Sequence, residues 1–225
     1  MIKANVGNIV WEIPERLTVD EWIRIQKWDF EVEAHWPWII HEISTIPAEE
    51  FEGADPDSMR LFIGFLIGAI NKRTQIEYKS FDELNFGQFV DLDCFLAAGV
   101  EKSLSDILEV LEVTTPWADE ALQIVEQFIK WRTTIFKQYK VLFNLNGNGD
   151  QEHEDDEFDP KSVARGWYNV IVDLAGNDIL KMDQITEEPL QKCLTFLQIK
   201  KEKALAEAQE ARKIRNAQRW HTKRL

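Results

Sequence analysis

The stretch from Asn144 to Asp159, NLNGNGDQEHEDDEFD, constrains the fold of this chain more than any other feature. It holds seven carboxylates and two glycines, with almost no apolar residue. A segment of this composition cannot bury enough apolar surface to offset the entropy lost on ordering, so it stays solvated. Helical patterns occupy both flanks. We therefore expect a helical body at residues 1–143, an acidic flexible linker at 144–159 and a C-terminal helical segment at 160–225.

The charge of the chain is unevenly distributed. The net charge is −14, but nine Lys and Arg stand against three Glu from Lys200 to Leu225, so this end carries +6 and the rest −20. An acidic body repels nucleic acid, which argues against nucleic acid as a partner. The basic end could still contact RNA or DNA, the acidic body itself or an acidic partner protein. Nucleic-acid binding that survives deletion of this end would exclude the first alternative.

The composition indicates a globular protein that does not cross a membrane. A hydrophobic share of 44% over 225 residues is enough for a core. No run approaches the roughly 18 apolar residues of a membrane span. The N-terminal residues lack the basic start and apolar run of a signal peptide, so we expect none. Cys94 and Cys193 show no CxxC spacing, and we expect buried, reduced thiols, which fits a reducing compartment.

The fold class is expected to be mainly α. One short strand is predicted at Asn8–Ile13, where apolar residues alternate with others. Gln75–Tyr78 is a candidate second strand that would pair with it, giving a small two-stranded β element near the N-terminus. The remaining periodic segments have helical spacing, and the longest of the first part runs from Thr115-Pro116 to about Phe143.

Helix starts are marked by local signals. Capping boxes are predicted at three places and Asp-Pro starts at two. The positions are Thr18 with Glu21, Asn85 with Gln88, Ser103 with Asp106, Asp55-Pro56 and Asp159-Pro160.

The segment Leu61–Ile70 is apolar on nearly all sides, which predicts a central buried helix. Gly64 and Gly68 lie four residues apart in it. In a soluble chain this spacing favours close packing against another helix.

Chemistry-bearing motifs are missing from the sequence. No phosphate-binding glycine loop, dinucleotide fingerprint, HExxH or GxSxG occurs. The histidines share no helix face, and the acidic linker lacks the glycine and final glutamate of an EF-hand loop. Asp91 and Asp93 point to different sides of a helix, so they form no acid–base pair. We predict no catalytic residue, cofactor or metal and expect a protein that is not an enzyme, although an unfamiliar active site stays an alternative.

Two surfaces are candidates for binding a partner. One is an aromatic N-terminal surface, and the other is the C-terminal helix with its basic end. Core packing is the alternative for the tryptophans. Because that basic end has few apolar residues, removing Lys200–Leu225 should spare folding. The candidate partner-binding residues are Trp22, Trp28, Trp36, Trp38, Trp167, Lys200, Lys201, Arg212, Arg215 and Arg219.

Two segments resemble tail-assembly proteins of tailed bacteriophages. The first is FDELNFGQFVDLDCFLAAGVEKSLSDILEVLE, Phe81–Glu112, which is similar to a family stretch L-T-F-G-[EQ]-[FY]-[IV]-D-[IL] followed by L-H-x-I-L-x-V-L. The matching residues are Leu84, Phe86, Gly87, Gln88, Phe89, Val90, Asp91 and Leu92, then Leu104, Ile107, Leu108, Val110 and Leu111. This chain departs from the family pattern at Asn85 and Ser105, where the family has Thr and His, and at Glu112-Val113-Thr114, which replaces Y-R-P.

The second segment is ARGWYNVIVDLAGNDILKMDQITEEPLQKCLTFLQIKKEK, Ala164–Lys203. It resembles the family region G-W-Y-x-V-I-x-x-L-A-x-G-D-I-x-K-x-D-x-I-x-x-x-P-x-x-x-x-L-x-F-L. Here Asn177-Asp178 replaces Gly-Asp. The two segments together cover about a third of the chain.

The resemblance implies a small helical chaperone or assembly factor of tail or baseplate morphogenesis. Such a protein holds a tape-measure or hub client soluble in the host cytoplasm until tail subunits polymerise. The alternative is a structural component of the virion, such as a tail, baseplate or packaged protein. The expected partners are phage tail or baseplate proteins, and self-association stays open. By this resemblance the acidic linker lies where such proteins have a flexible junction.

Overall fold

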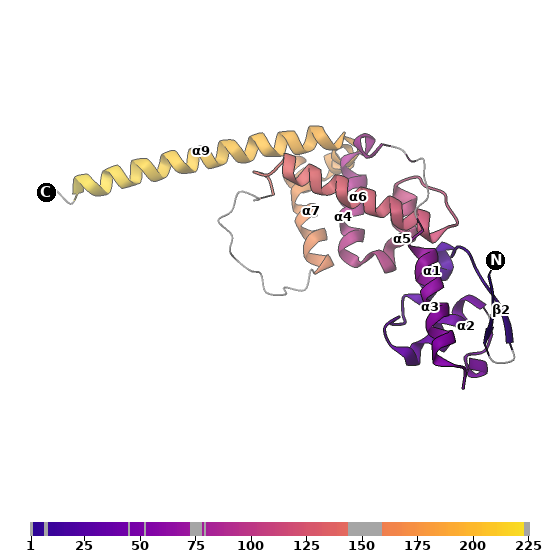
Figure 1. The fold of residues 1–225 in the computed structure, drawn as a ribbon. Coiled ribbons are helices and arrows are strands. Elements are labelled where there is room, and N and C mark those ends of the chain that lie inside the picture. Colours follow the sequence, from indigo (N-terminus) through magenta and orange to yellow (C-terminus); the bar gives the residue numbers. More distant parts are fainter. Residues whose placement is uncertain are drawn as a thin grey trace. The chain divides into compact units, whose positions relative to one another are not determined.

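The structure is a computed structural model and describes residues 2–6, 9–44, 46–51, 53–72, 78, 80–143 and 159–222. Most of these residues form helices (Figure 1). The mainly α prediction is confirmed. No helix among these residues combines the length and the apolar character needed to cross a membrane. Short 3-10 helices lie at Glu33–His35, Ala48–Phe51, Phe81–Glu83 and Ile179–Lys181.

The chain divides into two units. The first consists of Met1–Lys79 and Ala98–Phe128, and the second of Ser80–Ala97 and Ile129–Leu225. This division differs from the predicted boundary at 144–159, because residues beyond 160 pack in the same unit as 80–97 and 129–143. Residues 144–158 of the predicted linker lie outside the described residues.

The first unit combines a β hairpin with helices. Its elements are β1 (Ile2–Val6), β2 (Ile9–Ile13), α1 (Val19–Ile25), α2 (Trp36–Ser44), α3 (Pro56–Ile70), α5 (Val100–Val110) and the first part of α6 (Ala118–Gln138). β1 and β2 are antiparallel, with Ile2 opposite Ile13 and Val6 opposite Ile9. The sequence placed a strand at Asn8–Ile13 but named 75–78 as its partner. Residues 75–77 are not described, so that second pairing stays a prediction.

An ion-paired cluster joins the start of α1 to the start of α6 in this unit. Arg16 donates to both carboxylate oxygens of Asp119, at 2.9 and 2.8 Å, and to Glu120 at 2.7 Å. Two main-chain hydrogen bonds lie beside it, from Val19 N to Pro116 O and from Ala118 N to Leu17 O. The predicted capping box is present just after it, where Thr18 and Glu21 bond reciprocally.

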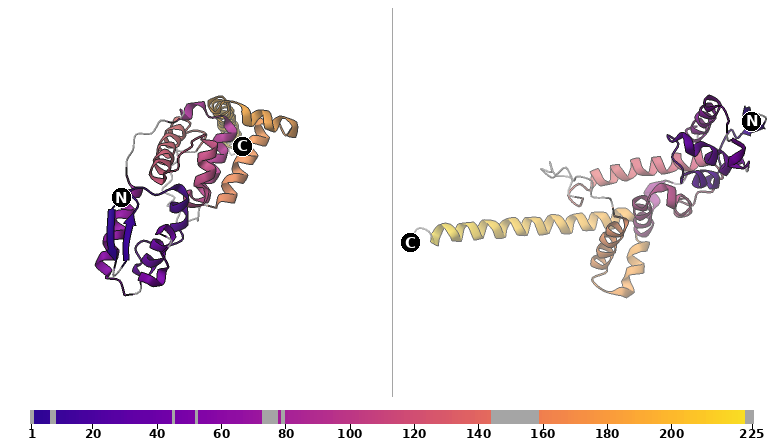
Figure 2. Two further views of the ribbon diagram at one scale, coloured as in Figure 1. Left: turned by 90° about the vertical axis from the view of Figure 1, so that its right-hand side faces the viewer. Right: turned by 90° about the horizontal axis from the view of Figure 1, so that it is seen from below.

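The second unit is built from helices alone in the part described. Its elements are α4 (Phe86–Ala98), the remainder of α6, α7 (Pro160–Leu174), α8 (Met182–Glu187) and α9 (Leu190–Thr222). The predicted starts at Asn85 and Asp159 are confirmed by side-chain caps. α9 is one continuous helix, which the right-hand view of Figure 2 shows along its length.

Two helix boundaries differ from the predictions. α5 begins at Val100, and Ser103 is buried inside it instead of capping it. α6 ends at Gln138, and a turn carries the chain on to Phe143. In both cases the apolar spacing located the helix but not its boundary. Gly99, whose φ is positive, immediately precedes the start of α5.

α3 is only half buried, which corrects the prediction of a central helix. Its core side carries Met59, Phe62, Ile63, Leu66 and Ala69. Leu61, Phe65 and Ile67 are 64%, 40% and 42% exposed. Gly64 and Gly68 have no atom within 4 Å of an added Cβ, so neither makes the predicted close helix contact.

Candidate functional site

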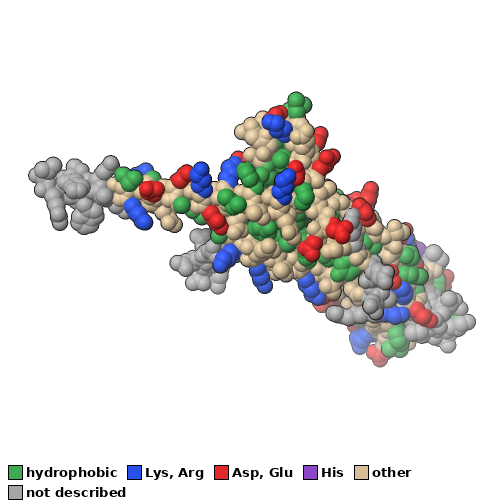
Figure 3. All heavy atoms as spheres, turned by 90° about the horizontal axis from the view of Figure 1, so that it is seen from above, with side chains coloured by type: hydrophobic (Ala, Val, Ile, Leu, Met, Phe, Trp, Pro, Cys, Tyr) green, Lys and Arg blue, Asp and Glu red, His purple; other side chains and the backbone are tan. Residues whose placement is uncertain are grey.

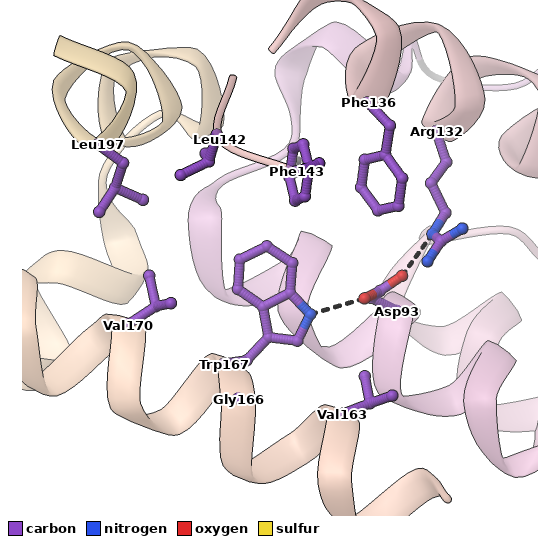
Figure 4. Close-up of a pocket in the computed structure, with 10 residues that line it drawn as sticks. All are labelled: Asp93, Arg132, Phe136, Leu142, Phe143, Val163, Gly166, Trp167, Val170 and Leu197. Atoms are coloured by element: carbon purple, nitrogen blue, oxygen red, sulfur yellow. Dashed lines mark hydrogen bonds and ion pairs between the residues drawn. The ribbon is translucent and has the colours of Figure 1, made fainter. Parts of the chain in front are cut away.

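An open cavity of about 360 Å³ lies in the second unit beside the indole of Trp167 (Figure 4). α7 contributes a stripe of residues at helical spacing, and the end of α6, the turn after it and α9 supply the other walls. The lining is mostly apolar. It consists of Asp93, Arg132, Phe136, Leu142, Phe143, Val163, Gly166, Trp167, Val170 and Leu197.

Aromatic rings form the wall around Trp167. Phe86 and Phe89 meet its indole edge-on, with centroids 5.8 and 5.7 Å away. Phe143 meets it at 6.3 Å and stacks on Phe136 at 4.1 Å. Edge-to-face pairs at these distances contribute beyond their buried area, so the rings give the cavity a rigid wall.

One buried carboxylate, that of Asp93, lies among these rings. Asp93 is 4% exposed. One of its oxygens accepts a 2.6 Å hydrogen bond from the indole N–H of Trp167, and the other is paired with the guanidinium of Arg132. That guanidinium lies 4.2 Å from the centre of the Phe136 ring. Because a buried charge is tolerated only when paired, this cluster fixes the orientation of the Trp167 and Arg132 side chains.

The structure brings residues 81–97 and 164–203 together in this unit. Phe86 N donates to Glu188 O at 2.8 Å, and Leu190 N donates to Leu84 O at 3.3 Å. An added Cβ on Gly87 would lie 2.9 Å from the Cβ of Thr186. Glycine is therefore required where the first turn of α4 meets the end of α8. The segments 81–112 and 164–203 are far apart in sequence, yet parts of both supply the cavity wall.

The predicted aromatic N-terminal surface is only partly a surface. Trp22 and Trp36 are buried in the first unit, and the Trp36 indole donates to Phe30 O at 2.8 Å. They are core residues because helical spacing places them on the inward sides of α1 and α2. Trp28 and Trp38 stack with centroids 5.6 Å apart, and Trp38 is 42% exposed. This pair is what remains of the predicted surface.

Trp167 is buried as well, so it acts as a wall of the cavity instead of an exposed contact. Tyr168, next to it on α7, is the exposed aromatic residue there. This burial agrees with the place of Trp167 in the helical repeat of Val163, Trp167 and Ile171, and its role in partner binding stays a prediction.

The first two lysines of the predicted basic end are engaged inside the second unit. Lys200 pairs with Asp173 of α7 at 2.6 Å, and Lys201 donates to Leu142 O at 2.8 Å. Arg212 and Arg215 are exposed, while the side chain of Arg219 lies outside the described residues. Charged side chains line this part of α9 (Figure 3). Lys200 is nevertheless exposed, whereas Lys201 is only partly exposed.

The described residues form an apolar cavity, and they provide neither a metal site nor an activated thiol. No group of three or more His, Cys, Asp or Glu side chains in that part of the chain could hold a metal ion. Cys94 and Cys193 are free thiols. Burial, with nearby carboxylates, raises the pKa of both thiols, so neither is activated as a nucleophile. The cavity can accept apolar groups, and its one charged cluster is internally paired.

Sequence reasoning missed most of the residues around this cavity. Asp93 carried the available signal, because it stands between Leu92 and Cys94 on the apolar side of a helical run. Asp91 and Asp93 do point to different sides, as predicted, since Asp91 is exposed and Asp93 is buried. A carboxylate on the buried side of a helix requires a partner. Its partners Arg132 and Trp167 are 39 and 74 residues away, beyond the reach of any local pattern.

Comparisons with protein-family models, with curated proteins and with solved structures find no match for this chain. What the protein does must therefore follow from its own residues.

Proposed function

We propose that this protein is a non-enzymatic assembly chaperone of a tailed bacteriophage. It binds a tape-measure or hub protein in the host cytoplasm while the tail or baseplate assembles. The observation that carries the proposal is the open apolar cavity beside Trp167, half of whose lining residues come from segments that resemble tail-assembly proteins.

The size of the cavity suits a helical client. Ligand pockets typically span about 300 to 1,000 Å³. A volume of about 360 Å³ lies at the small end of that range and takes one or two large apolar side chains. An amphipathic helix offers such side chains three or four residues apart and lays them into an apolar groove. The chaperone would thereby cover an apolar stripe of the client without enclosing it.

The residues around the cavity favour tight binding of a client helix. Trp167 and Phe143 are fixed by ring contacts, so little side-chain entropy is lost when a client binds. Rigid aromatic side chains of this kind are frequent hot spots of protein interfaces. The net charge of −14 further favours a client helix that carries basic residues beside its apolar stripe.

Co-expression with the tape-measure or hub protein of the same phage tests the proposal. We expect the client to be recovered in the soluble fraction, bound to this protein, at several times the amount found without it. Unchanged solubility and no co-purification of either client would refute the chaperone role.

A structural role in the virion is the alternative, and purified particles separate the two. Mass spectrometry should find the protein absent or far below the copy number of tail subunits if it is a chaperone. Stoichiometric presence in the particles would favour the structural role.

A further inference from the structure

The outer side of α3 in the first unit is an apolar helix face without a partner in the described part of the chain. Leu61 and Phe65 are exposed on it, and no charged residue occurs from Leu61 to Ile70. Gly64 and Gly68 lie on the same side and leave open space where side chains would stand. Exposed glycines inside a helix each cost about 1 kcal/mol relative to alanine. Packing inside this unit does not account for them.

Charge marks the two ends of this face. Asp57, in the first turn, is exposed and makes only a surface pair with Arg60 at 3.3 Å. Lys72, two residues beyond the helix, is exposed at the opposite end. The series Asp57, Leu61, Gly64, Phe65, Gly68 and Lys72 has steps of four, three, one, three and four residues. Such steps keep the five positions that lie in α3 on one side of the helix. Lys72 follows just beyond the helix end, where it also lines the hollow beside Asp119 and Glu126.

This series is complementary to itself when it is reversed. If Asp57 of one copy lies opposite Lys72 of another, the same antiparallel register sets Leu61 opposite Gly68 and Phe65 opposite Gly64. Each large side chain then fills the space above a glycine, and each negative end meets a positive one. A parallel pair would instead set Asp57 against Asp57 and Phe65 against Phe65. A self-complementary patch of this kind is what a two-fold dimer requires.

We propose that α3 is a homodimer interface, in which two copies of the chain pack antiparallel through Leu61, Gly64, Phe65 and Gly68. The end charges select this orientation, and the antiparallel helix dipoles agree with it. The proposal concerns the first unit and does not depend on the client or on the cavity of the second unit.

Analytical ultracentrifugation of the full chain tests the proposal over about 5 to 200 μM, because a single-helix interface lies at the small, weak end of protein interfaces. We expect a reversible monomer–dimer equilibrium. Phe65→Asp should raise the dissociation constant at least about 100-fold, since two carboxylates would be buried without partners. The matched control is Phe196→Asp, which places the same charge at an exposed phenylalanine of α9 in the other unit. It should leave the equilibrium unchanged. Melting by circular dichroism should be unaltered in both variants.

A charge exchange distinguishes the antiparallel arrangement from any other. Asp57→Lys and Lys72→Asp should each weaken the dimer a few-fold, because exposed ion pairs are weak. Combining them in one chain should restore the original constant, since the swapped ends again meet opposite charges. A chain that stays monomeric at every concentration would overturn the proposal. So would a dimer that Phe65→Asp does not weaken, or single charge changes that the double variant fails to rescue.

Discussion

Each of the two units buries one aspartate against one arginine, yet the two sites differ in their surroundings. Asp119 in the first unit is 2% exposed, and Arg16 bonds both of its oxygens. Asp93 in the second unit is 4% exposed, and Arg132 shares it with the indole of Trp167. The first pair closes a junction between chain segments. The second lies in the wall of an open cavity of about 360 Å³.

The difference shows that the surroundings of a buried ion pair, and not the pair itself, indicate whether a ligand could bind beside it. A hollow also adjoins Asp119, but it measures about 110 Å³ and has polar and charged residues in its lining, among them Asn71, Gln123 and Glu126. That site offers little room, and only Ile70 and Leu122 of its lining are apolar. The Asp93 site has aromatic walls around a larger space. The same pair of residue types therefore joins two chain segments in the first unit and borders the candidate binding cavity in the second.

Removing Arg16 or Arg132 is expected to have the largest effect on stability. If the two losses differ, the two buried ion pairs are not equivalent. Arg16→Ala and Arg132→Ala each leave a buried carboxylate without its cation, which costs about 3 to 5 kcal/mol of unfolding free energy. Denaturant titration followed by fluorescence of the tryptophans measures it. Arg60→Ala removes exposed pairs and should cost less than about 1 kcal/mol. If Arg132→Ala also costs less than about 1 kcal/mol, the hydrogen bond from Trp167 alone is enough to stabilise the buried carboxylate of Asp93.

Two glycines of the second unit should respond in opposite directions. Gly87→Ala forces a contact of 2.9 Å against Thr186. We expect it to destabilise the fold by about 1 to 3 kcal/mol, as overpacking does. Gly166→Ala, on α7 beside the cavity, meets nothing within 4 Å and should stabilise by up to about 1 kcal/mol. Equal effects in a urea titration would show that α4 and α8 do not approach as described.

Two truncations sharpen the boundary of the basic end. Deleting Glu202–Leu225 removes residues that are exposed throughout the described part and should change stability by less than about 0.5 kcal/mol. Deleting Lys200–Leu225 also removes the contacts to Asp173 and Leu142. It should cost about 1 kcal/mol more, from one hydrogen bond and one surface pair. Thermal melts of the two truncated proteins measure the difference in their stability. If the protein that lacks Glu202–Leu225 is unfolded, the distal part of α9 packs into the core.

The smallest expected effect is a dependence of the first unit's stability on pH. Partial burial would raise the pKa of Glu120, but hydrogen bonds from Thr115 and Arg16 lower it below the ordinary value of 4.5. Glu120 therefore adds stability that is present above about pH 4.5 and is lost as the pH falls through its lower folded pKa. We expect Glu120→Gln to remove this part, less than about 1 kcal/mol. Unfolding titrations between pH 6 and 3 measure it, and identical pH profiles would contradict the assignment.

Local signals predicted much of the fold. The caps at Thr18, Asp55, Asn85 and Asp159 all begin helices, because each involves residues only three positions apart. The division into units could not be predicted in the same way. It depends on contacts such as Asp93 with Trp167 and Leu84 with Leu190, which join segments that no periodic pattern relates.

The candidate site was predictable only in outline. Tryptophans were expected to contact a partner, but an apolar repeat marks only the inward side of a helix and does not reveal that a cavity opens beside it. Trp167 is thus buried while Tyr168 is exposed. Likewise the apolar run of α3 indicated a buried helix, since its length and composition do not reveal that Leu61 and Phe65 face outward.

Filling the cavity tests the central claim most directly. Gly166→Leu adds a side chain where the structure has open space, next to Trp167. Co-purification of the phage tape-measure and hub proteins with this variant is compared with Tyr168→Leu, a change at the exposed neighbour. We predict that Gly166→Leu lowers client recovery at least about tenfold, an effect on the order of 1.4 kcal/mol. Its melting temperature should be no lower than that of the unaltered protein, because leucine, like alanine, favours a helix more than glycine does. Full recovery with Gly166→Leu would contradict a client site in this cavity.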